Sequence, residues 1–506
     1  MNMHIPQFKR KFVISNNPID HPLLTGWQNG TIGGRHAYWD DSLPVVIRGN
    51  ERIEIGLFGY MLDPERTADS DEQIVDGIVN TAESLEDVIR VTNRMCGRWA
   101  LFVAIGSRQY IINDAAGQRQ AFYHLAEGVE IIASSEHLLA SLFGLQRSER
   151  TVNEFFAGHT PEFLTGCWFV GDSTIYDGVF CLVPSHALDI AARKQVRFWP
   201  LSRRRVHRQD REANFEIIHN LIDKHFEALF HRFGEAALAL TGGLDSRSSL
   251  AHCKPFKDKI LCYTVNTGQG TGVVAEADRS DRGLDYKVPG EITTAYGIKY
   301  ALYDRIGKLP EWYVTEYNLN ASLNRPVFQH MAYQMFNEGY PQHKVSIQSC
   351  INELSRSQYV HRPYRVKLKE LANFTSMGHL PFVMKNLQSW YEGAVDLNNE
   401  YGTRIEDLFF LEQLMGRWSA MNRNEWDFVQ EAFEPFNSRD LIFRIFCIDQ
   451  PDRLRWPNKF YLYRFKRAWP ELLDFQTTVQ EKYFGKPQIG LHIRQGLKRI
   501  YYALGG

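Results

Sequence analysis

A short polar turn near the middle of this 506-residue chain carries the residue types that hold a phosphate group. It reads Leu240-Thr241-Gly242-Gly243-Leu244-Asp245-Ser246. Two adjacent glycines allow a tight turn in which backbone N–H groups approach an anion, and a helix that begins there adds the positive end of its dipole. The hydroxyls of Thr241 and Ser246 can bind phosphate oxygens, and the Asp245 carboxylate can hold a magnesium ion that bridges them.

The sequence around the turn predicts elements that would position it. Residues 236–240 are a short apolar run typical of a buried parallel strand, and residues 215–233 have apolar side chains at helical spacing. A second apolar strand follows at 260–265. Since ligands in open α/β sheets bind beyond the carboxyl ends of strands, Thr264 and Val265 are candidates for contact with an adenine or ribose. A buried strand end explains them equally well.

The whole segment 241–246 indicates a nucleotide-binding turn more specifically than its two glycines do alone. A Gly-Gly turn also occurs in ordinary strand-to-helix connections, and a Walker loop would need GxxxxGK[ST]. Between an apolar strand and a helix, residues 241–246 closely resemble the SGGxDS signature of PP-loop ATP pyrophosphatases. The resemblance implies that residues 240–246 bind ATP and Mg²⁺.

The rest of the chain indicates two domains, as its length favours. Residues 45–145 contain strand-like runs at 45–47, 53–55, 99–105, 110–112 and 129–132, and one helix is expected over 74–91. Two more strand-like runs lie within 178–199. The basic stretch at 203–208, interpreted as a solvated linker rather than a nucleic-acid patch, marks the boundary between domains 1–205 and 206–506. Alternating helices and strands after it predict a parallel sheet, and residues 300–440 have a mostly helical composition.

Composition and charge narrow the classes of partner. A formal net charge of −1 gives no overall field that would attract nucleic acid or an anionic membrane. Seven cysteines without a CxxC pair argue against a disulfide framework and a zinc ribbon. The chain has no apolar run of about 18 residues and no signal-peptide pattern at its start. We therefore expect a cytoplasmic protein with neither nucleic-acid nor membrane partners, and its oligomeric state stays open.

Several further segments, taken in order, resemble one family. Residues 96–102 are similar to an "NGMFAF" strand, residues 113–123 to "RDxxGxxPLYY", residues 133–136 to "ASE", and residues 163–199 to "FLxG … TxFxGIxxLPPG … YW". These motifs belong to the asparagine synthetase family, which includes β-lactam synthetases and lasso-peptide cyclases. The resemblance implies an α/β and α+β protein. An Ntn-type αββα sandwich would precede a PP-loop, adenine nucleotide α-hydrolase-like parallel-sheet domain with a helical C-terminal part.

The chain departs from this family at two places. Members that hydrolyse glutamine use an N-terminal cysteine, whereas the first cysteine here is Cys96, so we expect a degenerate glutamine-amidotransferase-like domain without glutaminase activity. The family's metal loop "SGEGSDEL" aligns with residues 347–354. Glu353 is retained, but Asn352 stands where an aspartate would be, and its amide oxygen is a weaker ligand for a hard cation. The resemblance implies Asp245 and Asn352 as metal ligands.

A lysine near the C-terminus completes the expected catalytic set. Residues 435–439 resemble the family's "PFLD" without its aspartate, and residues 458–464 resemble "KxxLR". The lysine of that motif contacts the phosphates and the charge that develops during ligation. The resemblance therefore implies Lys459, Asp245 and Glu353 as catalytic residues, although a surface position is the commonest one for any lysine.

The expected function is that of an ATP-dependent amide-forming ligase. A small-molecule or peptide carboxylate would be adenylated with release of pyrophosphate, and ammonia or an amine, from solution or from a partner protein, would displace AMP. One alternative is a PP-loop tRNA-modifying enzyme, which would need a basic groove and catalytic cysteines. Another is a non-catalytic nucleotide-binding scaffold, which Asn352 favours. A set of aromatic residues could wall an acceptor pocket or form helix core: Trp312, Tyr313, Tyr317, Phe328, Tyr333 and Phe336.

Overall fold

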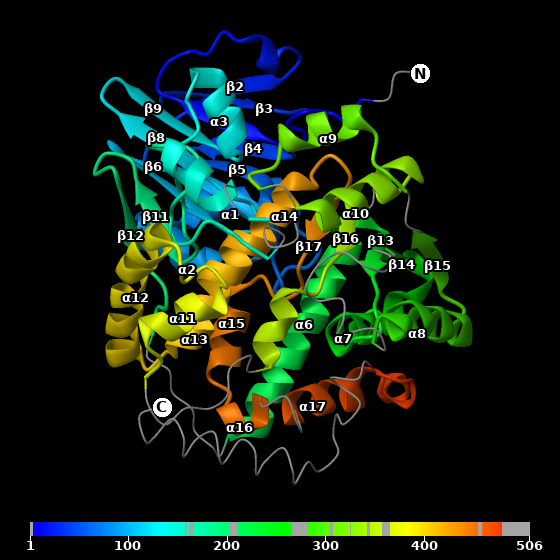
Figure 1. The fold of residues 1–506 in the computed structure, drawn as a ribbon. Coiled ribbons are helices and arrows are strands. Elements are labelled where there is room, and N and C mark those ends of the chain that lie inside the picture. The colour runs from blue at the N-terminus through cyan, green and yellow to red at the C-terminus, as the bar shows by residue number, and fades with distance from the viewer. Residues whose placement is uncertain are drawn as a thin grey trace.

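Three β-sheets organise the chain. The structure is a computed structural model of all 506 residues, and it describes residues 4–156, 159–160, 166–202, 210–265, 281–303, 307–323, 325–341, 345–356, 365–453 and 458–477. Within these residues lie two six-stranded antiparallel sheets and one five-stranded parallel sheet. Figure 1 shows the N-terminal antiparallel layers, in blue and cyan, above the green and yellow helices of the second half.

The two antiparallel sheets pack face to face. The first has the order β10 (Phe180–Cys181), β8 (Phe122–Ala126), β9 (Val129–Ala133), β1 (Phe12–Ser15), β3 (Arg35–Trp39), β2 (Gln28–Ile32). The second has the order β12 (Lys194–Arg197), β11 (His186–Asp189), β7 (Arg108–Asn113), β6 (Cys96–Ile105), β5 (Ile53–Leu62), β4 (Val45–Gly49). Alternate side chains of each sheet meet in a shared core, in which the rings of Phe12 and Phe58 stack with centroids 4.5 Å apart.

Helices cover the outer faces of this pair of sheets. α3 (Glu136–Phe143) packs on the first sheet, and α1 (Asp71–Thr81) and α2 (Leu85–Thr92) pack on the second. The predicted αββα sandwich is confirmed. The single helix expected over 74–91 is two helices, because Ala82 leaves the helical conformation and Ser84 starts a new helix with a capping box to Asp87.

The parallel sheet has its central strand directly before the polar turn. Its order is β15 (Lys299–Tyr303), β14 (Ile260–Val265), β13 (Ala236–Ala239), β16 (Val345–Ile347), β17 (Glu431–Phe433). Leu238 of β13 faces a core shared with α6 (Arg211–Phe233), α7 (Leu244–His252) and α8 (Asp281–Tyr296). Ala237 faces the opposite core, shared with α9 (Glu311–Asn318) and α10 (Pro326–Asn337). The predicted α/β layer is confirmed.

The remaining described elements are mostly helical, as predicted for residues 300–440. They are α4 (Glu149–Thr151), α11 (Leu368–Phe374), α12 (Pro381–Tyr401), α13 (Ile405–Phe409), α14 (Ala420–Glu425), α15 (Arg439–Phe446), α16 (Gln450–Arg453), α17 (Lys459–Ala468), π-helical Val152–Phe156 and Phe410–Ser419, and 3-10 helical Pro22–Leu24, Lys254–Lys259, Ile351–Ser355 and Pro470–Asp474. The expected domain boundary at 203–208 lies outside the described residues. Among the helices that are described, none has the length and apolar character needed to cross a membrane.

A buried cluster of charges joins the sandwich to the parallel sheet. Arg98 of β6 donates to both Asp427 and Glu431, with 2.8 Å between its Nη1 and Glu431 Oε1. Arg119 Nη2 donates to Glu431 Oε2 at 2.7 Å, and Lys11 donates to Asp427. All five residues are buried, and Glu431 is the first residue of β17. The cluster therefore ties the edge of the parallel sheet to three elements of the sandwich.

These cations control the ionisation of the two carboxylates. Burial by itself would raise the pKa of Asp427 and of Glu431. The attraction of Arg98, Lys11 and Arg119 outweighs burial at Asp427, and that of Arg119, Arg98 and Arg10 outweighs it at Glu431. Both pKa values therefore lie below their usual range. Both groups stay ionised in the folded protein.

We predict that Arg98→Met destabilises the protein by about 3–5 kcal/mol, because it leaves two buried carboxylates short of a cation. Urea unfolding followed by circular dichroism measures the loss. Arg90→Met is the matched control, since Arg90 lies on the exposed side of α2 and its ion pairs among the described residues are with Glu86 and Asp87. Equal stability of the two variants would contradict a structural role for the cluster.

The same cluster gives stability a defined pH dependence. A lowered carboxylate pKa stabilises the folded state above the unfolded-state value of about 4, and this contribution is lost as pH falls through the folded value. Glu431→Gln should therefore be less stable than the parent at neutral pH and should lose less further stability on acidification. Melting temperatures measured from neutral to acid pH check this; parallel curves for the two proteins would refute it.

Candidate functional site

The polar turn lies at the carboxyl end of the central strand. Leu240 follows β13 and its N–H donates to Tyr263 O at 2.9 Å. The Thr264 hydroxyl donates to Leu240 O at 2.7 Å and accepts from the Tyr300 hydroxyl at 2.9 Å. Val265 is the last residue of β14 and is half-buried. The structure thus brings the two predicted β14 residues beside the start of the turn; the loop at 266–268 lies outside the described residues.

Hydrogen bonds within the turn occupy both predicted phosphate-binding hydroxyls. Thr241 N–H donates to Ser246 Oγ at 3.0 Å, and the two hydroxyl oxygens are 3.1 Å apart. Gly243 N–H donates to Thr241 Oγ1 at 3.2 Å. These bonds fix the loop in a closed turn before α7 begins at Leu244.

Gly242 meets helix α8 with no room for a side chain. A Cβ at this position would lie 2.7 Å from the carbonyl oxygen of Leu284, and the Gly242 N–H donates to Asp285 Oδ1 at 3.0 Å. The amide therefore already binds an anionic oxygen, and that oxygen belongs to the chain itself. A phosphate that takes this amide must displace the Asp285 carboxylate.

Asp245 is the charged centre of the site. It lies in the first turn of α7, where the helix dipole favours a negative charge, and 18% of its side chain is exposed. Arg356 and the Tyr461 hydroxyl both donate to its carboxylate. Tyr461 is buried, and burial together with the Asp245 charge raises the pKa of its hydroxyl well above the usual value. Tyr461 therefore acts here as a hydrogen-bond donor.

The expected metal loop packs against the start of α7. Asn352, in the 3-10 helix Ile351–Ser355, donates from Nδ2 to Asp245 O at 3.2 Å and to Ser249 Oγ at 3.0 Å. The other amide atom, Asn352 Oδ1, is buried and has no hydrogen-bond partner among the described residues. Glu353 lies 3.8 Å from Arg356. The structure thus brings Asp245, Asn352 and Glu353 to one edge of the sheet.

This donor set fits a magnesium ion. Mg²⁺ takes oxygen ligands, and the site offers the Asp245 carboxylate and the orphaned amide oxygen of Asn352. Arg356 balances the Asp245 charge in the structure. Metal binding at Asp245 would require Arg356 and the Tyr461 hydroxyl, which each donate to one carboxylate oxygen, to move aside or to share that oxygen.

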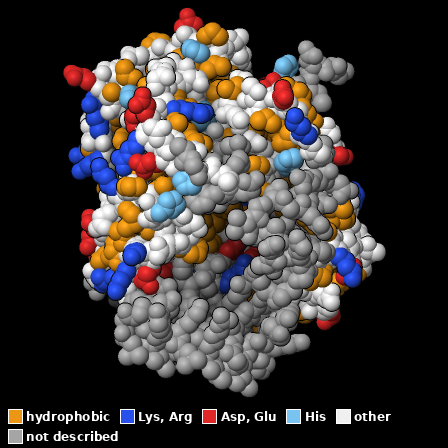
Figure 2. Space-filling view, viewed as in Figure 1, with side chains coloured by type: hydrophobic (Ala, Val, Ile, Leu, Met, Phe, Trp, Pro, Cys, Tyr) orange, Lys and Arg blue, Asp and Glu red, His pale blue; other side chains and the backbone are white. Residues whose placement is uncertain are grey.

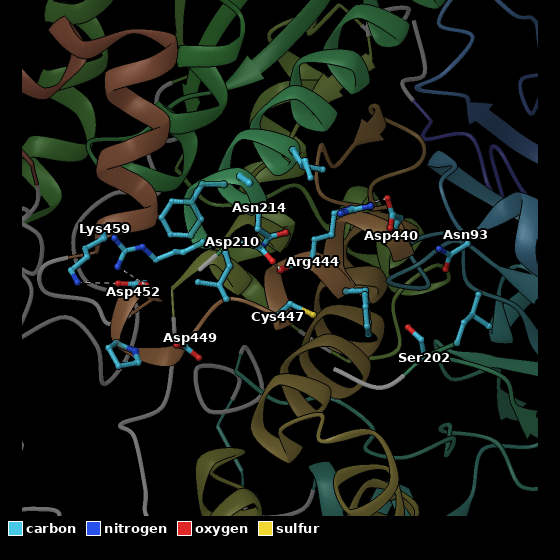
Figure 3. Close-up of a pocket in the computed structure, with 18 of the residues that line it drawn as sticks. Asn93, Ser202, Asp210, Asn214, Asp440, Arg444, Cys447, Asp449, Asp452 and Lys459 are labelled. Atoms are coloured by element: carbon cyan, nitrogen blue, oxygen red, sulfur yellow. Dashed lines mark hydrogen bonds and ion pairs between the residues drawn. The ribbon is translucent and has the colours of Figure 1, made fainter. Parts of the chain in front are cut away.

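Lys459 lies away from this group. It begins α17, its side chain is 53% exposed, and its Nζ is 3.1 Å from Asp452 Oδ1. Figure 3 shows it at one end of a cavity of about 760 Å³ that Asp452, Arg444 and Cys447 also line. Since side chains two residues apart project from nearly opposite sides of a helix, Lys459 and Tyr461 point in different directions. The catalytic role of Lys459 stays a prediction, and this geometry does not favour it.

Three residues of the site carried no signal that the sequence analysis used. Tyr461 belongs to the segment that resembles "KxxLR". Its position two residues after Lys459 in a helix could have shown that the two side chains point to opposite sides. Arg356 follows Asn352 by one helical turn and lies two residues beyond the expected metal loop at 347–354. Asp285 is distant from Gly242 along the chain, so no local motif connects the two.

Two other expectations concern residues outside the site. The aromatic set forms core: Tyr313, Tyr317 and Tyr333 are buried on the α9 and α10 side of the sheet, and the other three members pack against them. This arrangement favours the helix-core interpretation over an acceptor pocket. Cys96 is buried in β6, and burial raises the pKa of its thiol.

Charge on the molecular surface shows no segregation in the view of Figure 2. Lys and Arg side chains lie interspersed with Asp and Glu side chains over the described residues of that face. This pattern agrees with the formal net charge of −1.

Comparison with known proteins gives loose structural likenesses and no sequence match. No protein-family model matches the chain, and no curated protein sequence does. A solved structure of glutamine phosphoribosylpyrophosphate amidotransferase from B. subtilis, complexed with ADP and GMP, aligns with 58% of this chain at 9% sequence identity and a TM-score of 0.23. The alignment spans 60% of that chain.

We predict that Gly242→Ala destabilises the protein by about 1–3 kcal/mol, because the new methyl group overlaps the backbone of α8. Gly290→Ala is the matched control within α8, where the added Cβ meets nothing nearer than Tyr300 Cε1 at 3.9 Å. The control should gain about 0.5–1 kcal/mol, since alanine is the better helix former. Urea unfolding measures both, and a Gly242→Ala variant as stable as the control would show that the close approach is unimportant.

Proposed function

We propose that this protein is an ATP-dependent amide-forming ligase that activates a carboxylate as an acyl-adenylate. The observation that carries the proposal is the turn 241–246 at the carboxyl end of the central parallel strand, with Asp245 and the orphaned oxygen of Asn352 beside it. Ligands in such sheets bind beyond the carboxyl ends of the strands. The ordered resemblance to the asparagine synthetase family, from residue 96 to residue 464, supports carboxylate activation as the reaction.

Each group of the site has a role in this reaction. The N–H groups of the turn and the N-terminus of α7 would hold the phosphates of ATP. Magnesium, held by Asp245 and Asn352, would neutralise part of the phosphate charge. Arg356 is the described cation in contact with Asp245, and it is placed to offset charge as pyrophosphate leaves.

The bonds change in two steps. An oxygen of the substrate carboxylate bonds to the α-phosphorus of ATP, the bond from that phosphorus to the bridging oxygen breaks, and pyrophosphate leaves. The nitrogen of ammonia or an amine then attacks the acyl carbon, the bond to AMP breaks, and the nitrogen releases a proton. Electrostatic stabilisation of the leaving phosphates is the main contribution expected from the protein.

A second candidate is a nucleotide-binding protein that does not catalyse ligation. Two observations favour it: Asn352 supplies a neutral ligand in place of a carboxylate, and Arg356 neutralises Asp245. The position of Lys459 also favours this candidate, because its side chain pairs with Asp452 and does not lie on the side of α17 that carries Tyr461. Nucleotide binding is common to both candidates, and only turnover separates them.

Calorimetric titration with ATP and Mg²⁺ tests nucleotide binding, which both candidate functions require. The parent protein should bind, and Asp245→Ala should lose about tenfold or more in affinity, because it removes the central charged group of the site. Asp258→Ala, at an exposed position shortly after α7, should bind as the parent does. Absence of binding by the parent protein would refute both candidates.

Release of AMP and pyrophosphate in the presence of ammonia and a panel of carboxylates then tests ligation. Turnover that depends on the carboxylate, and is lost in Asp245→Ala, supports the ligase. ATP binding without turnover on any panel member supports the second candidate.

A further inference from the structure

Two packed helices, α6 and α7, bring two imidazoles and a carboxylate together. The group lies at the C-terminal end of α7, and the polar turn lies at its N-terminal end. His219 and Asp223 lie one helical turn apart on α6, and His252 is the last residue of α7. One ligand atom from each residue lies within 4.8 Å of the other two. His252 Nδ1 is 2.6 Å from Asp223 Oδ1, and His219 Nε2 is 3.3 Å from Asp223 Oδ2.

These separations are close to those of ligands around one small cation, and the shortest is that of a hydrogen bond. Zinc takes imidazole nitrogen and carboxylate oxygen at about 2.0–2.2 Å in tetrahedral geometry, which places neighbouring ligand atoms roughly 3.3 Å apart. A histidine followed four residues later by an aspartate presents both side chains on one face of a helix. The three groups therefore need only small side-chain adjustments to share an ion.

The protonation states also suit a metal ion. Burial lowers the pKa of His252 to about 4, and burial lowers the pKa of His219 as well. Both imidazoles are thus neutral at physiological pH, the form that binds metals. An ion on Nδ1 of His252 would replace the hydrogen that Nδ1 donates to Asp223, and the neutral ring would then carry its single hydrogen on Nε2.

The site has an opening to solvent. The side chains of His219 and His252 are buried, whereas 48% of the Asp223 side chain is exposed. The ring of His252 is held in a fixed orientation, stacked on Phe226 with an angle of 6° between the ring planes. An ion can therefore enter along Asp223 and meet two imidazoles that the packing already positions.

Two charged side chains lie near the cluster: Glu216, which is paired with its neighbours, and Arg464, which is stacked on aromatic rings. Glu216, one turn before His219, accepts from Tyr463 and from Arg467, whose Nη2 lies 3.1 Å away. Arg464 also lowers the pKa of both histidines. Its guanidinium is buried over the rings of Phe436 and Tyr461, at 4.7 and 5.4 Å from their centroids. The positive charge of Arg464 opposes any cation equally, so the selection comes from the two imidazole nitrogens, which favour a transition metal over a hard cation.

We propose that His219, Asp223 and His252 form a binding site for a divalent transition-metal ion, with Zn²⁺ as the fitting ion and a fourth position open to water or to a ligand atom from solution. Three protein ligands and one open position are the arrangement of reactive rather than purely structural zinc sites. The site is separate from the nucleotide site: Asp245 and His252 are seven positions apart on α7, about 10 Å along the helix. The proposal does not depend on the proposed ligase activity.

Cobalt provides the probe, because Co²⁺ replaces Zn²⁺ in nitrogen and oxygen sites and its visible absorption reports low coordination numbers. The full-length protein, stripped with a chelator and kept reduced, should take up one equivalent of Co²⁺ with a visible band that Zn²⁺ abolishes. Asp223→Asn and His219→Gln should each lose about tenfold or more in Zn²⁺ affinity by competition titration, since even the loss of an outer partner costs that much.

His231→Gln is the matched control. His231 lies on the same helix, is exposed, and pairs with Glu227 at 3.8 Å in the same spacing of four residues. It should leave the Co²⁺ band and the Zn²⁺ affinity unchanged. Circular dichroism checks that Asp223→Asn, a change at an exposed position of the same size, leaves the fold intact.

Two results would overturn the proposal. The first is the absence of a visible Co²⁺ band in the parent protein. The second is a band of equal strength and affinity in folded Asp223→Asn and His219→Gln, which would place the ion on cysteines or on other histidines.

Discussion

The structure depends on one desolvated group of charges, in which Lys11, Arg98 and Arg119 of the sandwich surround Asp427 and Glu431 at the edge of the parallel sheet. Ions removed from water are costly to leave without partners, so the two halves must meet in the single arrangement that pairs them all. β17 is fixed by this contact, and β17 in turn pairs with β16. The chain that leaves β16 carries Asn352 and Arg356 to the site.

A second charge organises the site itself. The Asp245 carboxylate is approached by Arg356 from the segment after β16 and by Tyr461 from α17. Tyr461 also donates to the backbone carbonyl of Asn352 at 3.2 Å. Three segments that are far apart in the sequence therefore converge on one side chain. The site is held together by hydrogen bonds to a single anion, so its shape and its electrostatic potential are set by the same contacts.

Local sequence patterns predicted many of the strands and helices, and tertiary contacts determined their bounds and the strands that no pattern marks. The apolar run at 260–265 is β14, and the turn at 241–246 lies where strand and helix signals placed it. The strand expected at 53–55 continues to Leu62, because its later residues are buried on both faces and show no alternation. The first three strands were not predicted, since no motif marks them.

The reach of local patterns also explains which site residues were predicted correctly and which were not. Asp245 and Asn352 come together because both lie at carboxyl ends of neighbouring parallel strands, which is a property of the fold class. The direction of Lys459 depends on the phase of α17, and a motif match one residue out of phase turns a side chain by about 100°. Asp285 enters through the packing of α8 on Gly242, which no spacing in the sequence records.

The contact between Asp285 and the Gly242 amide gives the turn a built-in competitor. A small monovalent anion would gain at this amide little more than the Asp285 carboxylate already gains, and it would first have to displace that carboxylate. A polyphosphate reaches several donors at once, so the loss of one internal hydrogen bond is a minor part of its binding. Such a loop would discriminate against small monovalent anions such as chloride, in favour of ligands with several linked charges.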